Sequence, residues 1–197
     1  QVLDYDHGLP DNIVKKFHID RNNTVWMGTE DAGVLSFDPA TGKTSSLIKS
    51  GWQFGNLTDF SFDGDQVWIS TPQSGLVLYD VKTEEAKLYN SNTGFDFMSV
   101  NTLLTDYEGN IWIGTKSGVV RTLGDHVEYI DHFDPYENTS VLALTVDKQN
   151  NIWFSTSDGL FKRSIDKSGK AVVEKLPFKT SLKSSATISL YTDSAGY

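Results

Sequence analysis

A Trp-centred hexapeptide recurs four times along this chain of 197 residues. The copies are TVWMGT at 24–29, QVWIST at 66–71, NIWIGT at 110–115 and NIWFST at 151–156. Their tryptophans are separated by 42, 44 and 41 residues. A period in the low forties is typical of a propeller blade built from four strands. The repeat therefore limits the fold more strongly than length or composition does.

Each hexapeptide stands at the same place in a longer pattern. An apolar stretch that ends in Asp precedes it, as VNTLLTD does at 100–106, and a short polar link joins the two. The stretch predicts a strand, and the Asn, Gly and Asp of the link predict a hairpin turn. The hexapeptide is apolar on both faces, as expected of a strand between two sheets. A glycine, a third strand and a looser fourth strand follow.

The tryptophans of the repeat are predicted to fill the gaps between neighbouring sheets, where a large flat ring buries much surface. They are Trp26, Trp68, Trp112 and Trp153. Two positions after each of them the chain has only Gly or Ser, namely Gly28, Ser70, Gly114 and Ser155. This restriction predicts a close approach of the next sheet at that position.

The pattern predicts an all-β fold, a β-propeller of four-stranded antiparallel blades. Residues 1–6 match the fourth strand of a preceding blade, and residues 187–197 repeat the start of a fifth. Four repeats leave unpaired edges in a ring of about seven blades. We therefore expect a fragment of a larger, seven-bladed propeller or a ring joined by two copies. Complete blades are expected over residues 8–49, 55–90, 98–130 and 140–177.

Charge and composition exclude several classes of function. Lys and Arg total 17 against 26 Asp and Glu, a net charge of −9, which argues against nucleic acid or an anionic membrane as partner. The absence of cysteine excludes a disulfide scaffold, a thiolate zinc site and a Cys nucleophile. No apolar run approaches the roughly 18 residues of a membrane span, and the opening residues lack the features of a signal peptide.

Residues 8–39, GLPDNIVKKFHIDRNNTVWMGTEDAGVLSFDP, resemble the two-component regulator propeller repeat. That repeat reads approximately Gly-Leu-Pro-x-Asn-x-Val, then Asp-x-x-Gly-x-hydrophobic-Trp-hydrophobic-Gly-Thr. DYEGNIWIGTKSGVV at 106–120 follows it most closely. The second repeat departs from it by QVWIST and by a turn that is shorter by one residue, and the fourth by NIWFST.

The resemblance implies a periplasmic sensor region of a hybrid two-component system. Such a system joins a sensor, a membrane span, a histidine kinase, a receiver and a DNA-binding module in one chain. Sensors of this family detect oligosaccharides and control glycan-utilisation genes through a phosphorelay. The implied partners are an oligosaccharide and the rest of the sensor chain, with a homodimer as a further option. The resemblance implies no catalysis, cofactor or metal in this segment, and membrane contact only through a separate span.

Candidate ligand-binding residues come from the links at one end of the predicted blades. Propellers tend to bind ligands where the links between second and third strands emerge beside the links from blade to blade. The former hold Glu30, Gln73, Lys116 and Asp158. The latter hold Trp52, Phe54, Phe95, Phe97, His132 and Tyr136. Aromatic rings beside polar groups suit a sugar, and the alternative is that the rings cap the blade ends.

Two other functions stay open from the sequence. NNIWFSTSDGL at 150–160 also resembles the repeat of streptogramin lyases, propellers that need a His and a metal at the central face. Only His7 and His132 fall in blade-to-blade links, so few histidines are placed where they could form a catalytic site. DHFD at 131–134 is too short and loose for a specific metal site. The third function is a scaffold for protein–protein contact or dimerisation.

Overall fold

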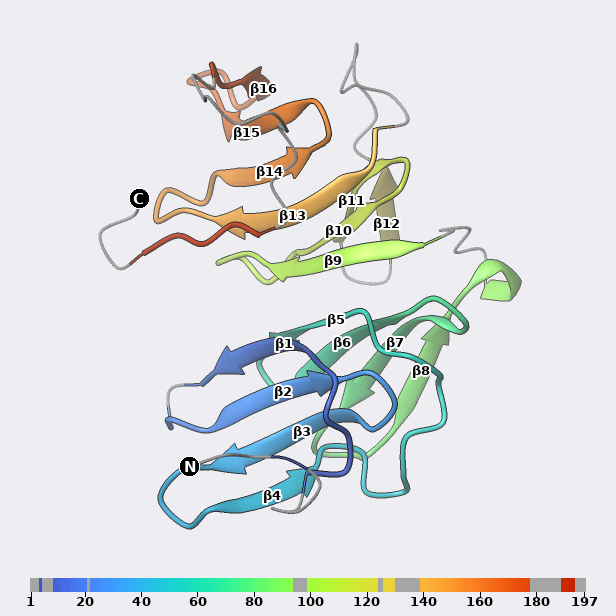
Figure 1. Cartoon of the computed structure of the whole chain (residues 1–197). Coiled ribbons are helices and arrows are strands. Elements are labelled where there is room, and N and C mark those ends of the chain that lie inside the picture. The colour runs from blue at the N-terminus through green and yellow to red at the C-terminus, as the bar shows by residue number, and fades with distance from the viewer. Residues whose placement is uncertain are drawn as a thin grey trace. The chain divides into compact units, whose positions relative to one another are not determined.

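The computed structural model describes residues 4, 9–20, 22–93, 99–123, 126–129, 139–177 and 189–193. Within these ranges the fold is all-β, with sixteen strands in four sheets (Figure 1). The chain divides into two compact units, Gln1–Met98 and Ser99–Tyr197, which are described separately. In the part of the chain that the structure describes, no helix is long and apolar enough to cross a membrane.

The first unit contains two antiparallel sheets whose strands pair in chain order. The first sheet consists of β1 (Val14–Ile19), β2 (Val25–Thr29), β3 (Gly33–Asp38) and β4 (Lys43–Ser46). The second sheet consists of β5 (Asp59–Asp63), β6 (Gln66–Thr71), β7 (Gly75–Asp80) and β8 (Ala86–Tyr89). A single turn of 3-10 helix, η2 (Ser91–Thr93), follows the second sheet.

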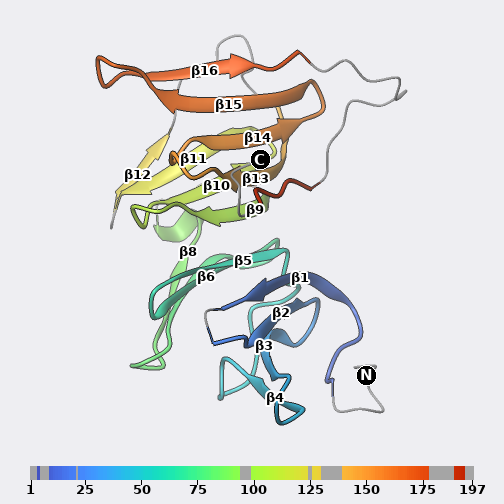
Figure 2. The ribbon, with the colours of Figure 1, turned by 90° about the vertical axis from the view of Figure 1, so that its left-hand side faces the viewer.

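The second unit repeats this arrangement. The third sheet consists of β9 (Val100–Thr105), β10 (Ile111–Thr115), β11 (Gly118–Leu123) and β12 (His126–Tyr129). The fourth sheet consists of β13 (Val141–Val146), β14 (Ile152–Thr156), β15 (Gly159–Ile165) and β16 (Ala171–Lys175), side by side in chain order in Figure 2. Four antiparallel sheets of four strands confirm the predicted fold class.

Each Trp hexapeptide forms the second strand of its sheet, and in each unit one of these Trp rings lies close to the other sheet of that unit. The ring of Trp26 lies 5.0 Å from that of Phe62, which belongs to the second sheet. The guanidinium of Arg163 in the fourth sheet lies 4.8 Å from the ring of Trp112. The core of each unit therefore sits between its two sheets, and Trp112 is only 1% exposed.

The small residue two positions after the Trp allows the neighbouring sheet to approach. A Cβ atom added to Gly28 would lie 2.8 Å from side-chain carbons of Leu57 and Phe60. A Cβ on Gly114 would lie 2.6 Å from the Cγ2 of Thr102 and 2.8 Å from the Cγ1 of Val141 in the fourth sheet. Such distances leave no room for a larger side chain.

A hydrogen bond joins the repeated Asp to the repeated Trp in three of the four repeats. The indole nitrogen donates to Asp20 at 3.0 Å, and to Asp106 and Asp147 at 2.8 Å. The same carboxylates accept backbone N–H groups of the hairpin turn, as Asp147 does from Gln149 and Asn151. The second repeat has a turn shorter by one residue, and the described residues show no such bond between Asp63 and Trp68.

These hydrogen bonds affect the acidity of the carboxylates. The bond from Trp26 is the main cause of the lowered pKa of Asp20. Burial raises the pKa of Asp147, but the bonds from Trp153 and Asn151 outweigh burial, so that the pKa is lowered overall. The folded state therefore favours the ionised form of Asp147.

The first strand of the first sheet carries apolar side chains that are covered at the same repeat position elsewhere. Phe17 and Ile19 on β1 are 61% and 64% exposed. Phe17 stands three residues before its repeat Asp, as Phe60 does in the second sheet. Phe60 is 1% exposed because the first sheet packs over it. The exposed face of β1 therefore resembles the face of β5 that the neighbouring sheet covers.

The predicted partial blades at the two ends lie mostly outside the described residues. Of residues 1–6 only Asp4 is described, and residues 189–193 contain no strand. The hydroxyl oxygen of Thr192 nevertheless lies 3.0 Å from that of Thr145 on β13. His18 and Phe62 stand at the same repeat positions and make the corresponding contact. The blade boundaries and the fifth blade stay predictions.

Replacing Asp147 with Asn should destabilise the chain and reduce the pH dependence of its stability. Hydrogen bonds to a charged group contribute about 1.5–3 kcal/mol, so we expect a loss of about 2 kcal/mol in the free energy of unfolding at pH 7. Because folding lowers the pKa of Asp147, its contribution is present above a pH of about 4 and is lost as the pH falls. The difference from the wild type should shrink at pH 3 in denaturant titrations.

The matched control is Asp63→Asn, in the repeat without the Trp bond, which should change stability by less than about 0.5 kcal/mol. An equal loss in both variants at pH 7 would contradict a specific role of the Asp–Trp bond.

Replacing Gly114 with Ala should lower stability by about 1–3 kcal/mol, because the added methyl group overpacks the contact with Thr102 and Val141. Adding Thr102→Ser removes the nearest of those carbons and should restore part of the loss. Thermal and denaturant unfolding of the single and double variants measure both effects. A fully stable Gly114→Ala variant would show that the sheets do not meet at this position.

Candidate ligand-binding site

The last residue of each hexapeptide fixes the link that follows it. The hydroxyl of Thr29 donates to the carbonyl of Gly33 at 2.8 Å, and that of Thr115 donates to the carbonyl of Gly118 at 2.9 Å. The hydroxyl oxygen of Thr71 accepts the N–H of Ser74 at 2.9 Å, and Thr156 does the same for Asp158 at 3.0 Å. The links between second and third strands are therefore held by the strand ends themselves.

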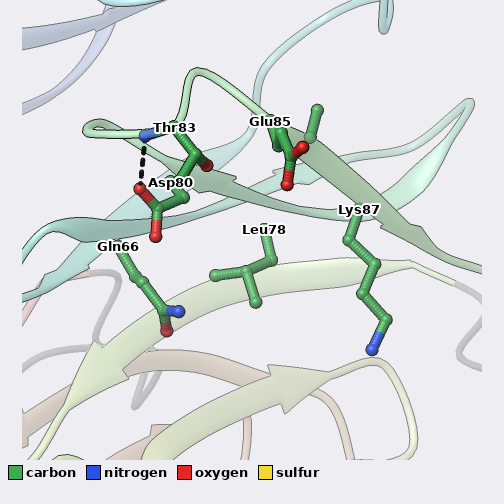
Figure 3. A pocket seen from close by; sticks show the side chains of 7 residues that line it. Gln66, Leu78, Asp80, Thr83, Glu85 and Lys87 are labelled. Atoms are coloured by element: carbon green, nitrogen blue, oxygen red, sulfur yellow. Dashed lines mark hydrogen bonds between the residues drawn. The ribbon is translucent and has the colours of Figure 1, made fainter.

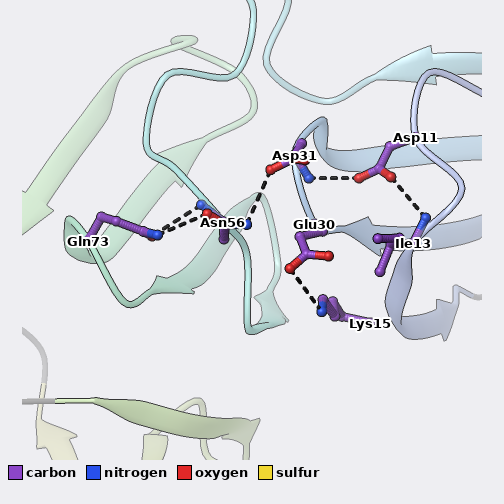
Figure 4. Close-up of polar contacts among 7 residues, drawn as sticks. All are labelled: Asp11, Ile13, Lys15, Glu30, Asp31, Asn56 and Gln73. Carbon is purple, nitrogen blue, oxygen red and sulfur yellow. Dashed lines mark hydrogen bonds and ion pairs between the residues drawn. The ribbon is translucent and has the colours of Figure 1, made fainter.

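In the first unit, a buried carboxylate holds the lead-in to β1 against the link after β2 (Figure 4). Asp11, which is 4% exposed, accepts the N–H of Ile13 at 2.8 Å and that of Asp31 at 2.7 Å. The backbone of Glu30 joins the same place, since its N–H donates to the carbonyl of Ile13 at 2.9 Å.

Asp31, Asn56 and Gln73 form a continuous row of polar side chains, called the amide row below (Figure 4). The Nδ2 of Asn56 donates to the Oδ1 of Asp31 at 3.2 Å. The Nε2 of Gln73 donates to the Oδ1 of Asn56 at 2.9 Å, and the N–H of Asn56 donates to the Oε1 of Gln73 at 3.1 Å. The row connects the link after β2, the blade-to-blade link and the link after β6.

The backbone is shaped to hold Gln73 in this row. Gly55 has a φ of +82°, which favours glycine, and a Cβ atom there would lie 2.8 Å from the Oε1 of Gln73. The amide of Gln73 thus lies in the space that a side chain at position 55 would fill.

Trp52 lies beside the amide row and is half-buried. Its ring covers Gly33, where a Cβ atom would lie 2.6 Å from the Cε3 of the indole. Its N–H donates to the carbonyl of Gly55, and its ring packs edge-on against Phe54 at 5.2 Å. Both aromatic rings also pack against the core between the first and second sheets.

The position of Trp52 in the repeat indicates that it caps a blade. It stands eleven residues before its repeat Asp, and Leu9 stands at the same distance from Asp20. Leu9 is 3% exposed and packs against Met27, Leu35 and Phe37. Phe95 and Tyr136 share this spacing. A large apolar residue at this place thus belongs to the repeat.

Four of the ten candidate side chains are gathered at this end of the first unit: Glu30, Trp52, Phe54 and Gln73. Glu30 is half-buried and its carboxylate pairs with Lys15 at 3.3 Å (Figure 4). Lys116 and Asp158 are exposed in links of the second unit. Phe95, Phe97, His132 and Tyr136 lie outside the described residues.

Asp11, Asp31 and Asn56 are not among the candidate residues that the sequence predicts. Asp11 lies in the GLPDN lead-in, and Asp31 follows Glu30 in its link, so both stood next to positions that had been considered. Nothing in the sequence shows that Asn56 meets Gln73, because 17 residues separate them and only the fold brings them together.

An open hollow of about 550 Å³ lies at the other end of the second sheet (Figure 3). It is lined by Gln66, Leu78, Asp80, Thr83, Glu85, Ala86 and Lys87. Asp80 accepts the N–H of Thr83 at 2.9 Å, and this bond is the main cause of its lowered pKa. None of the candidate residues from the sequence lines this hollow.

Among the described residues, no three or more His, Asp or Glu side chains are grouped so that they could hold a metal ion. DHFD at 131–134 lies outside those residues.

Comparison with known proteins confirms the repeat type. The model of the two component regulator propeller family matches residues 8–31, 94–117 and 135–158. The second repeat, with its shorter turn, is not among the matched segments. No curated protein matches the chain.

Three solved structures show where this arrangement recurs. The extracellular domain assigned to a hybrid two component system of B. thetaiotaomicron is 25% identical with a TM-score of 0.71, over 93% of this chain and 26% of that one. PorZ, a surface component of the type-IX secretion system of Porphyromonas gingivalis, is 15% identical with a TM-score of 0.64. The match covers 95% of this chain and 30% of PorZ. Virginiamycin B lyase of Staphylococcus aureus is 14% identical with a TM-score of 0.63. The match covers 86% of this chain and 57% of the lyase.

The last two likenesses show the fold alone. The chain spans about a quarter of the length of the extracellular domain that it matches.

Replacing Trp52 with Ala should destabilise the first unit by about 2 kcal/mol, roughly half the cost for a fully buried ring, because Trp52 is half-buried. Trp52→Leu should keep most of the stability, since Leu9 fills the same position in the first repeat. Denaturant unfolding measures both variants. If Trp52→Ala were as stable as the wild type, the ring would not be a blade cap.

Proposed function

We propose that this chain, which carries two component regulator propeller repeats, is a ligand-sensing domain in the periplasmic part of a hybrid two-component system. The observation that carries the proposal is the amide row, which ties three links and the Trp52 ring into one ordered surface. The row joins links that lie 17 residues apart in the sequence, and binding residues are concentrated on loops that a rigid scaffold positions.

The proposed ligand is an oligosaccharide. Sugars are bound by convergent amide and carboxylate groups beside an aromatic ring, since they offer both hydroxyl groups and apolar C–H faces. Asp31 and Gln73 are exposed, and Asn56 and Trp52 are partly exposed, so a ligand in solution can reach these groups. The likeness to an extracellular domain of a hybrid two component system supports the sensor role on which this proposal of a ligand rests.

The proposed mechanism is a population shift. A ligand that binds one arrangement of the sensor more tightly than another increases the population of the first, and only that difference in affinity can act on a kinase. The phosphorelay and the control of glycan-utilisation genes reside in the rest of the sensor chain, and this segment performs no catalysis.

A glycan panel tests the proposal. We expect one class of oligosaccharide to stabilise the chain, by about 2.7 kcal/mol at a concentration of 100 times its dissociation constant, as measured by thermal shift. Gln73→Ala should weaken binding about tenfold, because a hydrogen bond contributes about 0.5–1.5 kcal/mol. The control Gln66→Ala removes an exposed amide at the other end of the second sheet and should bind like the wild type. Absence of any shift across the panel would refute the proposal.

A further inference from the structure

We infer that the amide row selects a neutral sugar through a vicinal pair of hydroxyl groups and discriminates against anionic sugars. This inference rests on the proposed function, because it assigns a ligand class to the same surface. It follows from the hydrogen-bonding capacity that the row leaves unused and from the charges around it.

The row presents an acceptor next to donors. Asp31 uses its Oδ1 for Asn56, and within the described residues its Oδ2 accepts no hydrogen bond. Gln73 uses its Oε1 and one Nε2 proton for Asn56, which leaves the second Nε2 proton. Asn56 likewise keeps one Nδ2 proton after its bond to Asp31.

A vicinal diol matches this order. One hydroxyl can donate to the free oxygen of Asp31, while the oxygen of the neighbouring hydroxyl accepts from the amide of Asn56 or Gln73. A carboxylate or sulfate group carries no proton to donate, so it would leave the Asp31 oxygen facing a second anion. The acceptor therefore requires a hydroxyl group at this place, the amides orient its neighbour, and the discrimination against anionic sugars comes from the negative charge of Asp31 and its surroundings.

The surrounding charges act in the same direction. Among the residues drawn in Figure 4, Asp11, Glu30 and Asp31 are acidic, and Lys15 is the basic one. The ammonium of Lys15 lies 3.3 Å from the carboxylate of Glu30, so its charge is compensated. An anionic ligand would approach a surface of net negative charge.

The row is held in place before a ligand arrives. Gly55 leaves the space that the Gln73 amide fills, and the N–H of Asp31 is bound by the buried Asp11. Groups that are fixed in advance lose little entropy on binding and reject ligands whose groups do not match. The selectivity is thus built into the backbone of the links as well as into their side chains.

The test compares matched ligands and one isosteric variant by calorimetry on the whole chain. Hexasaccharides of glucose, mannose, galactose and xylose form the neutral set, and hexagalacturonate and a heparin hexasaccharide form the anionic set. We expect a neutral hexasaccharide to bind at least tenfold more tightly than either anionic one. Asp31→Asn keeps the acceptor for Asn56 but replaces the free oxygen by a donor, so it should weaken neutral binding at least tenfold.

Glu174→Gln is the charge control, because it removes one exposed negative charge on β16, outside the row. It should leave both affinities unchanged. Tighter binding of an anionic hexasaccharide, or neutral binding that Asp31→Asn leaves unchanged, would overturn the inference while leaving glycan sensing in place. Failure of every hexasaccharide to bind would overturn both the inference and the proposed function.

Discussion

The contact between the two neighbouring sheets of each unit is the interaction on which the rest of this structure depends. It needs a large ring at one position of the second strand and almost no side chain two positions later. Trp112 and Gly114 meet these needs in the third sheet, where the ring faces Arg163 and the glycine faces Val141. The links at the strand ends take their places because the sheets are held at this separation.

The Asp–Trp hydrogen bond couples that contact to the hairpin turn. Asp106 and Asp147 accept hydrogen bonds from the turn and from the indole at once, so turn geometry and ring position are set together. A turn that is shorter by one residue changes this geometry, and the second repeat packs Trp68 against the ring of Tyr89 instead, at 5.4 Å.

The fold could be predicted from the sequence because the same pattern of strands, turn, Trp and small residue occurs four times. The strands, their order and the need for Gly28 and Gly114 all follow from what recurs. The candidate site depends on what does not recur. Gln73 and Trp52 were predicted as candidates from their links, but the bond to Asn56 joins residues that are distant in sequence. The role of Trp52 as a cap could be recognised only from the structure, where Leu9, a smaller residue at the same repeat position, is buried.

The exposed Phe17 and Ile19 on β1 have an evolutionary consequence. Within each unit, one sheet offers a face with a Trp and the other offers a face with an apolar first strand, and the two faces fit each other. A duplicated gene segment of one repeat length therefore encodes a sheet that already fits its neighbours on both sides. Arrays of this type can lengthen or shorten by whole repeats without inventing a new interface, while the links remain free to diversify in the ligands that they bind.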